Sequence, residues 1–189
     1  MSTRPNIAIF ASGNGSNMQA IMDYEHLAGE VVLLVCDQPD AYVLERAKEH
    51  NLPSFVCSPK RKANKQAYEQ SIIQALQKYE VDIIVLAGYM RLIGPDLLHA
   101  YEGNIINIHP SLLPSFKGLQ AIEQAVDAGV KVTGVTIHYV DEGMDTGPII
   151  AQEAVEIEVD DTLQDVEEKI HAVEHRLYPL TINKIIQEQ

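Results

Sequence analysis

The chain has 189 residues, 46% of them hydrophobic, and a formal net charge of −13 at pH 7. This length and composition predict a single domain with a well-filled core over residues 1–189. The acidic balance argues against nucleic-acid binding, which needs a basic face. No apolar run approaches the roughly 18 residues of a membrane helix, and the N-terminal apolar segment is too short for a secretory signal, so we expect a cytoplasmic protein with no membrane partner.

The first half of the chain alternates continuous apolar runs with amphipathic segments. We expect strands over residues 6–12, 31–37, 52–57, 81–89 and 105–109. Helices are expected from residue 18 to a C-cap at Gly29, and over 41–50 and 67–79. Continuous apolar strands that alternate with helices predict a mostly parallel, Rossmann-like α/β sheet with helices on both faces.

The second half begins with a helix over residues 119–129. KVTGVTIHYVDEG, residues 131–143, alternates as a half-exposed strand is expected to, and residues 148–158 read as its partner. We expect these later strands to form an antiparallel C-terminal portion. The last helix is predicted from about Thr162 to Ile186, with an interruption near Pro179.

A glycine-rich turn, GNGSN at residues 13–17, directly follows the first strand. Gly15 would let the backbone approach a ligand closely, while Ser16 and Asn17 could cap the following helix. Such a turn can present amides to a phosphate even in an acidic protein. It lacks the ending of a nucleotide P-loop, so an ordinary strand-to-helix turn remains the alternative.

Asn107 and His109 interrupt the apolar run IINIH. They lie on the same face of the strand, and Pro110 ends that strand just beyond them. Because ligands of open α/β sheets bind outside the carboxyl ends of strands, the pair predicts a functional site. A structural role for the histidine is the alternative.

An acidic turn, VDEGMDTGP, carries Asp141, Glu142 and Asp145. Acidic residues are common in turns, but a carboxylate near His109 would orient the ring and favour its protonated form. An amide, an imidazole and a carboxylate suit direct acyl transfer between two bound substrates.

Other kinds of site find little support in the sequence. His171 and His175 lie four residues apart without an obvious third ligand, so no metal is predicted. No GxSxG elbow is present, and Ser111 lacks the context of a nucleophile. Cys36 and Cys57 form no CxxC pair and are expected to be free, buried thiols.

Four stretches together, ASGNGSN, AGYMRLIGP, NIHPSLLP and HYVDEGMDTGPII, resemble the glycinamide ribonucleotide transformylases of the folate-dependent formyltransferase family. The resemblance covers nearly the whole chain, through EHRLYPL near its end. It implies transfer of a formyl group from the co-substrate 10-formyltetrahydrofolate to glycinamide ribonucleotide in purine biosynthesis. A monomer or homodimer without a metal is expected.

The resemblance also implies roles for individual residues. Asn107 and His109 would stabilise the oxyanion of a tetrahedral intermediate, and Asp145 would support His109 and help a water carry the proton to the folate. Gly15, Ser16 and Asn17 would hold the substrate phosphate, with Glu174 near the ribose. The expected folate-binding residues are Lys65, Met90, Arg91, Leu92, Ile93, Asn107, Asp141, Glu142, Gly143, Met144 and Asp145.

Two further alternatives remain open at this point. A formyltetrahydrofolate hydrolase would use water in place of the amine. A non-catalytic nucleotide-binding module would give the three polar positions a structural role only.

Overall fold

A computed structural model describes residues 4–188. A single sheet of seven strands runs through it in the order β3-β2-β1-β4-β5-β6-β7. The strands are β1 (Asn6–Ala11), β2 (Glu30–Cys36), β3 (Ser54–Val56), β4 (Ile83–Leu86), β5 (Ile105–His109), β6 (Val132–Tyr139) and β7 (Ile149–Glu156). The first five strands are parallel, and β6 and β7 continue the sheet antiparallel, as predicted.

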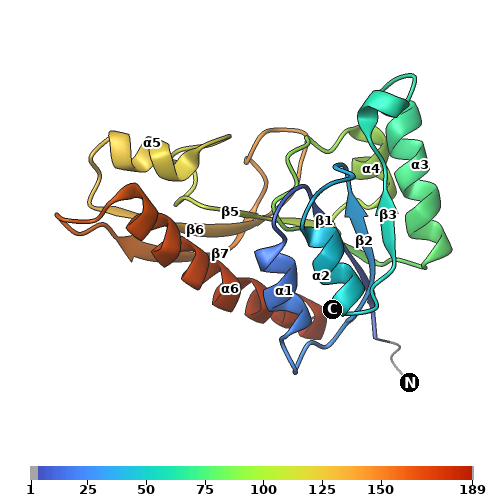
Figure 1. Cartoon of the computed structure of the whole chain (residues 1–189), viewed down its shortest axis with the longest axis horizontal. Helices are drawn as coiled ribbons and strands as arrows, with labels where there is room; N and C mark the ends of the chain where they lie inside the picture. Colours follow the sequence, from blue (N-terminus) through green and yellow to red (C-terminus); the bar gives the residue numbers. More distant parts are fainter. Residues whose placement is uncertain (1–3, 189) are drawn as a thin grey trace.

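Helices cover both faces of this sheet (Figure 1). The helices are α1 (Ser16–Met22), α2 (Val43–Glu49), α3 (Lys65–Lys78), α4 (Pro95–Ala100), α5 (Ala121–Asp127) and α6 (Leu163–Glu188), with a short 3-10 turn at Pro59–Arg61. Helices α1 and α6 lie side by side on one face, and α2 and α5 add buried side chains to the same cluster. Helices α3 and α4 pack on the other face.

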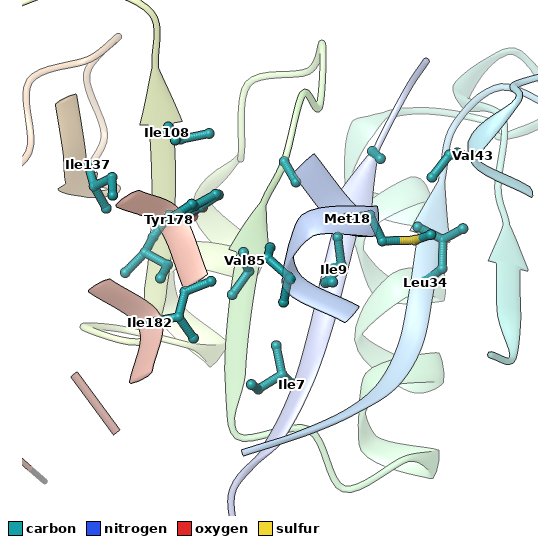
Figure 2. Packing of buried hydrophobic residues seen from close by; sticks show 14 of the residues in the cluster. Ile7, Ile9, Met18, Leu34, Val43, Val85, Ile108, Ile137, Tyr178 and Ile182 are labelled. Atoms are coloured by element: carbon teal, nitrogen blue, oxygen red, sulfur yellow. Dashed lines mark hydrogen bonds between the residues drawn. The ribbon is translucent and has the colours of Figure 1, made fainter. Parts of the chain in front are cut away.

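The larger apolar cluster joins both ends of the chain to the central strands. Figure 2 shows Tyr178 and Ile182 of α6 beside the sheet, with Met18 of α1 reaching toward Leu34 of β2 in the same cluster. Because β1 and β4 are buried on both faces, their sequences are continuously apolar rather than alternating. This packing fixes the carboxyl ends of the parallel strands, where the polar residues gather.

Strand β6 differs from its prediction. Residues 133–138 are all buried, whereas a half-exposed strand was expected. The strand lies inside the sheet between β5 and β7, and α6 packs against it. The hydroxyl of Thr136 bonds to the carbonyl of Ser111 and accepts from the amide of Leu113, so a polar residue is buried without an unpaired group.

Two helices, α1 and α6, also differ from their predictions. Helix α1 ends at Met22, and Gly29 does not cap it. Gly29 instead allows close approach, because a Cβ there would lie 2.6 Å from Cδ1 of Ile7. Helix α6 continues through Pro179 without interruption. Buried residues on both sides of the proline, Tyr178 and Ile182, hold the two turns against the sheet.

Candidate active site

A cavity of about 610 Å³ opens at the carboxyl ends of β1, β4 and β5. Its walls come from the glycine turn after β1, the loop after β4, the end of β5, the 140–145 loop and helix α6. This is where an open α/β sheet places its ligand site. Every residue predicted to act in catalysis or substrate binding lines the cavity, except Lys65.

His109 and Asp145 meet inside this cavity. Nδ1 of His109 lies 3.5 Å from Oδ2 of Asp145, and its Nε2 lies 2.8 Å from the carbonyl oxygen of Phe116. Both ring nitrogens therefore face oxygen acceptors, so either can donate when it carries a hydrogen. His109 is 5% exposed.

Asp145 is held from several sides. Its Oδ2 accepts from the amide of Gly118 at 2.8 Å, and its Oδ1 lies 3.7 Å from Nε2 of His138. Burial opposes the ionised form, but the nearby His138 ring, the Gly118 amide and the nearby His109 ring outweigh it, so the pKa of Asp145 is lowered. Asp145 also has a positive φ of 53°, a backbone conformation that persists only where surrounding contacts impose it.

His138 is a member of this cluster that the sequence reasoning missed. It lies directly opposite Asn107 in the antiparallel pairing of β5 with β6. Its Nδ1 lies 2.8 Å from the carbonyl of Tyr139, so Nε2 can accept from Nδ2 of Asn107 at 3.2 Å. The signal was a histidine in the strand that leads into the acidic turn, but only the pairing register reveals its partner.

The glycine turn approaches helix α2 closely. Gly15 has φ +79°, and a Cβ there would lie 2.4 Å from Cγ2 of Val43. Gly15 itself is the N-cap of α1 and makes no side-chain cap bond, so the prediction that Ser16 and Asn17 cap the helix is wrong. Both are the first residues of the helix, which leaves their backbone N–H groups at its N-terminus.

Asn17 and Glu174 join the glycine turn to α6. Nδ2 of Asn17 donates to Oε2 of Glu174 at 3.3 Å. Burial raises the pKa of Glu174, although His171 and the bond from Asn17 act in the opposite direction. Oδ1 of Asn17 is buried and has no hydrogen-bond partner within residues 4–188, so this wall keeps an unused acceptor.

The cavity wall formed by the loop after β4 and the 141–145 loop is partly apolar. Met90 and Leu92 are 63% and 60% exposed, and Met144 is also exposed. Asp141 accepts from the Gly143 amide at 3.0 Å and from the Thr146 hydroxyl at 2.6 Å, which orders the loop that carries Glu142 and Met144. Exposed apolar side chains around a cavity suit a flat hydrophobic ligand.

Lys65 lies outside the cavity lining. It is the first residue of α3, and its Cε would lie 2.5 Å from a Cβ placed on Gly94. It therefore sits beside the loop that carries residues 90–93 but does not reach the cavity wall.

Cys36 and Cys57 are free and buried, as predicted. Residues 4–188 contain no group of three or more histidine, cysteine or acidic side chains placed to hold a metal. Nor does this part of the chain contain a helix that could cross a membrane.

The fold and the cavity define an open α/β protein that binds ligands at the carboxyl edge of its parallel strands. Residues 5–182 match the family described as formyl transferase. The chain belongs to this family, which is a family of enzymes, and within it to the phosphoribosylglycinamide formyltransferases.

Three relatives within the family are similar to this chain over almost their full length. A phosphoribosylglycinamide formyltransferase of Bacillus subtilis is 57% identical over 95% of this chain and 93% of its own. The crystal structure of the Bacillus halodurans phosphoribosylglycinamide formyltransferase is 60% identical, with a TM-score of 0.94 over 96% of this chain and 95% of its own. A glycinamide ribonucleotide transformylase of Geobacillus kaustophilus is 55% identical, with a TM-score of 0.95 over 97% and 99% of the two chains.

These similarities decide between the alternatives left open by the sequence. The hydrolase is not favoured, because the relatives are named for transfer to phosphoribosylglycinamide. A non-catalytic module does not fit a chain whose relatives are enzymes.

Proposed function

We propose that this protein, acting as one formyltransferase domain over residues 1–189, transfers the formyl group of 10-formyltetrahydrofolate to the amine of glycinamide ribonucleotide. The observation that carries the proposal is the meeting of Asn107, His109 and Asp145 in the cavity of a formyl transferase fold. The reaction would serve purine biosynthesis in the cytoplasm.

The amine nitrogen would attack the formyl carbon directly, so the protein needs no nucleophile of its own. The formyl oxygen then becomes an oxyanion. Nδ2 of Asn107 has two hydrogens, and the bond to His138 uses one of them. The other can donate to the oxyanion, and a protonated His109 adds positive charge beside it.

Collapse of the intermediate would break the bond between the formyl carbon and N10 of the folate. The amine must lose a proton, and N10 must gain one. A water held near Asp145 and His109 would carry this proton. No metal is needed for these steps, because the charge that develops faces an amide and an imidazole.

The two substrates would occupy different walls. Gly15, Ser16 and Asn17 would hold the phosphate with backbone N–H groups, and Glu174 would accept from the ribose hydroxyls. The folate would lie against Met90, Arg91, Leu92 and Ile93, with the 141–145 loop over its pterin. Lys65 and the basic residues of the loop before it, Lys60, Arg61 and Lys62, would attract the folate from outside the cavity.

A formyl-transfer assay tests the proposal. Purified protein is mixed with glycinamide ribonucleotide and 10-formyltetrahydrofolate, and the change in folate absorbance is followed. We expect turnover that requires the ribonucleotide. Formyl release at a comparable rate without it would indicate a hydrolase instead.

A further inference from the structure

A salt bridge links the folate wall of the cavity to a buried carboxylate two strands away. Arg91, in the loop after β4, is the one arginine or lysine among the cavity-lining residues of the described chain. Its Nε donates to Oδ2 of Asp37 at 2.8 Å, at the end of β2. The Arg91 side chain is 40% exposed, whereas that of Asp37 is fully buried.

Stability alone does not account for this carboxylate. Oδ2 of Asp37 also accepts from Nε2 of Gln38 at 3.1 Å, but Oδ1 is buried and has no partner within residues 4–188. Burying an ionised group with half of its acceptor capacity unused is costly, and an apolar residue would often serve the fold as well. A function for the charge is therefore expected at the group it holds, which is Arg91.

The bond to Asp37 fixes how Arg91 can meet a ligand. A guanidinium is planar, and its donors point in fixed directions. With Nε occupied, the two Nη groups remain, for which the structure gives no hydrogen bond within residues 4–188. Two parallel N–H donors match the two oxygens of a carboxylate.

We propose that Asp37 is a positioning residue that holds Arg91 so that its two Nη groups bind a glutamate carboxylate of the folate. This inference rests on the proposed function. Because the Asp37–Arg91 pair is neutral as a whole, it recognises a ligand by oriented hydrogen bonds more than by net charge. That favours a planar carboxylate over a phosphate dianion, and Met90 and Leu92 beside Arg91 suit the aromatic part of a folate.

The test compares Asp37→Ala and Asp37→Asn with the wild type, using 10-formyltetrahydrofolate and its counterpart without glutamate, 10-formyltetrahydropteroate. We expect Asp37→Ala to raise the KM for the folate about tenfold, with a smaller change in kcat, because Arg91 loses its orientation. Asp37→Asn keeps an acceptor for Nε and should bring the KM back to within about threefold of wild type. The KM values for the pteroate and for the ribonucleotide should stay unchanged.

Two further variants separate positioning from a general effect on folding. Asp161→Asn removes an aspartate that also pairs with a cation, Lys169, but lies outside the cavity, so its kinetics should match wild type. In an Arg91→Ala background, adding Asp37→Ala should change the folate KM no further. If Asp37→Ala fails to fold, Asp37→Leu, which fills the side-chain volume but offers Nε no acceptor, gives the same comparison in both backgrounds.

Three results would overturn the inference: an unchanged folate KM, an equal rise for the pteroate, or an undiminished effect of Asp37→Ala when Arg91 is absent. Wild-type protein that transfers no formyl group would instead refute the proposed function. In that case, calorimetric titration with tetrahydrofolate and tetrahydropteroate still tests the role of Asp37, because binding requires no turnover. Wild type should bind the glutamate-bearing ligand more tightly, and Asp37→Ala should lose this preference.

Discussion

Asn107 illustrates how a polar residue is kept in an apolar strand. Its neighbours in β5 are buried isoleucines, and its amide bonds to the histidine opposite it in β6. Without that partner, a half-buried amide would be costly. His138 thus supports Asn107 and leaves one amide hydrogen for a ligand.

Replacement of this amide should affect turnover rather than binding. Asn107→Ala is expected to lower kcat on the order of 10² to 10³, the usual loss of one oxyanion donor. The Kd of the folate, measured by titration, should change little, because the interaction strengthens only as charge develops. A collapse in folate affinity with surviving turnover of the bound substrate would contradict the oxyanion role.

Asp145 should link stability to pH. Its pKa in the folded protein lies below the ordinary value, so the ionised form stabilises the fold. This contribution is complete above about pH 5 and is lost as the pH falls through roughly 4 and below, where the unfolded chain takes up a proton first. Urea unfolding of wild type and Asp145→Asn should therefore show a difference in the free energy of unfolding that narrows as the pH falls from about 6 to about 3.

The same variant also tests catalysis at neutral pH. Asp145→Asn should cut kcat on the order of 10² or more, because the carboxylate no longer supports His109. If the stability difference does not narrow in acid, Asp145 is not held by the contacts described above.

At the scale of elements, the glycine turn and α2 form one unit. The amide of Val43 donates to the carbonyl of Gly13 at 3.0 Å, and Gly15 allows Val43 to lie against the turn. Any side chain at residue 15 must displace α2 or reshape the turn that faces the cavity.

Gly15→Ala should therefore weaken binding of the ribonucleotide. We expect its KM to rise about tenfold or more, with a smaller effect on the folate KM, because the positive φ and the close contact both oppose a Cβ. Steady-state kinetics with each substrate varied in turn make the comparison. Equal effects on both KM values would argue against a phosphate site at this turn.

Helix α6 carries a charge that the fold does not favour. Because burial raises the pKa of Glu174, its ionised form destabilises the folded state. The contribution of Glu174 to the free energy of unfolding is fully present below about pH 4 and is lost as the pH rises through the raised pKa. Glu174→Gln should therefore be more stable than wild type at about pH 7 but not in acid. Thermal unfolding of both proteins at the two pH values measures the difference.

The same substitution, Glu174→Gln, should also weaken binding of the ribonucleotide. Glutamine is a weaker acceptor than a carboxylate, so Glu174→Gln is expected to raise the ribonucleotide KM several-fold. A variant that is both less stable and unchanged in KM would contradict the role of Glu174 as a ligand group retained at the expense of stability.

The loop after β4 is fixed at two points by buried carboxylates. Asp37 holds Arg91, and Glu69 of α3 accepts from the amides of Gly94 and Leu97. The Glu69 contacts also satisfy amides at the start of α4, which has no side-chain cap of its own. The folate wall therefore takes its shape from two elements distant in sequence.

At the scale of the whole molecule, Tyr178 connects the C-terminal helix to the strands below the cavity. The ring is fully buried (Figure 2), and its hydroxyl lies 2.8 Å from the carbonyl of Leu86 and 3.3 Å from that of Ile106. These carbonyls belong to β4 and β5, two strands whose ends carry site residues.

Tyr178→Phe removes this hydroxyl and leaves the ring in place. We expect the free energy of unfolding to fall by about 1–3 kcal/mol, the cost of leaving a buried polar group unpaired. Urea unfolding measures the change, and Thr181→Ala, which removes a hydroxyl bonded only within α6 to the carbonyl of Leu177, is a matched control. A larger loss in the control would place the importance of this region in the helix itself.

The sequence by itself determined the elements whose signals are local. Continuous apolar runs marked β1, β2, β4 and β5 because these strands are buried on both faces. The polar pair Asn107 and His109, the glycine turn and the acidic turn were all visible as departures from local patterns. Their family resemblance then implied how they act together.

Only the tertiary structure decided the features that depend on distant partners. Strand β6 alternates in sequence but is buried, because it lies between β5 and β7 with α6 packed against it. Likewise, His138 and Asp37 gain their significance from Asn107 and Arg91, which lie 31 and 54 residues away. Local preference fixes which segments are strands, but the register of pairing and the crossing of loops fix which side chains meet.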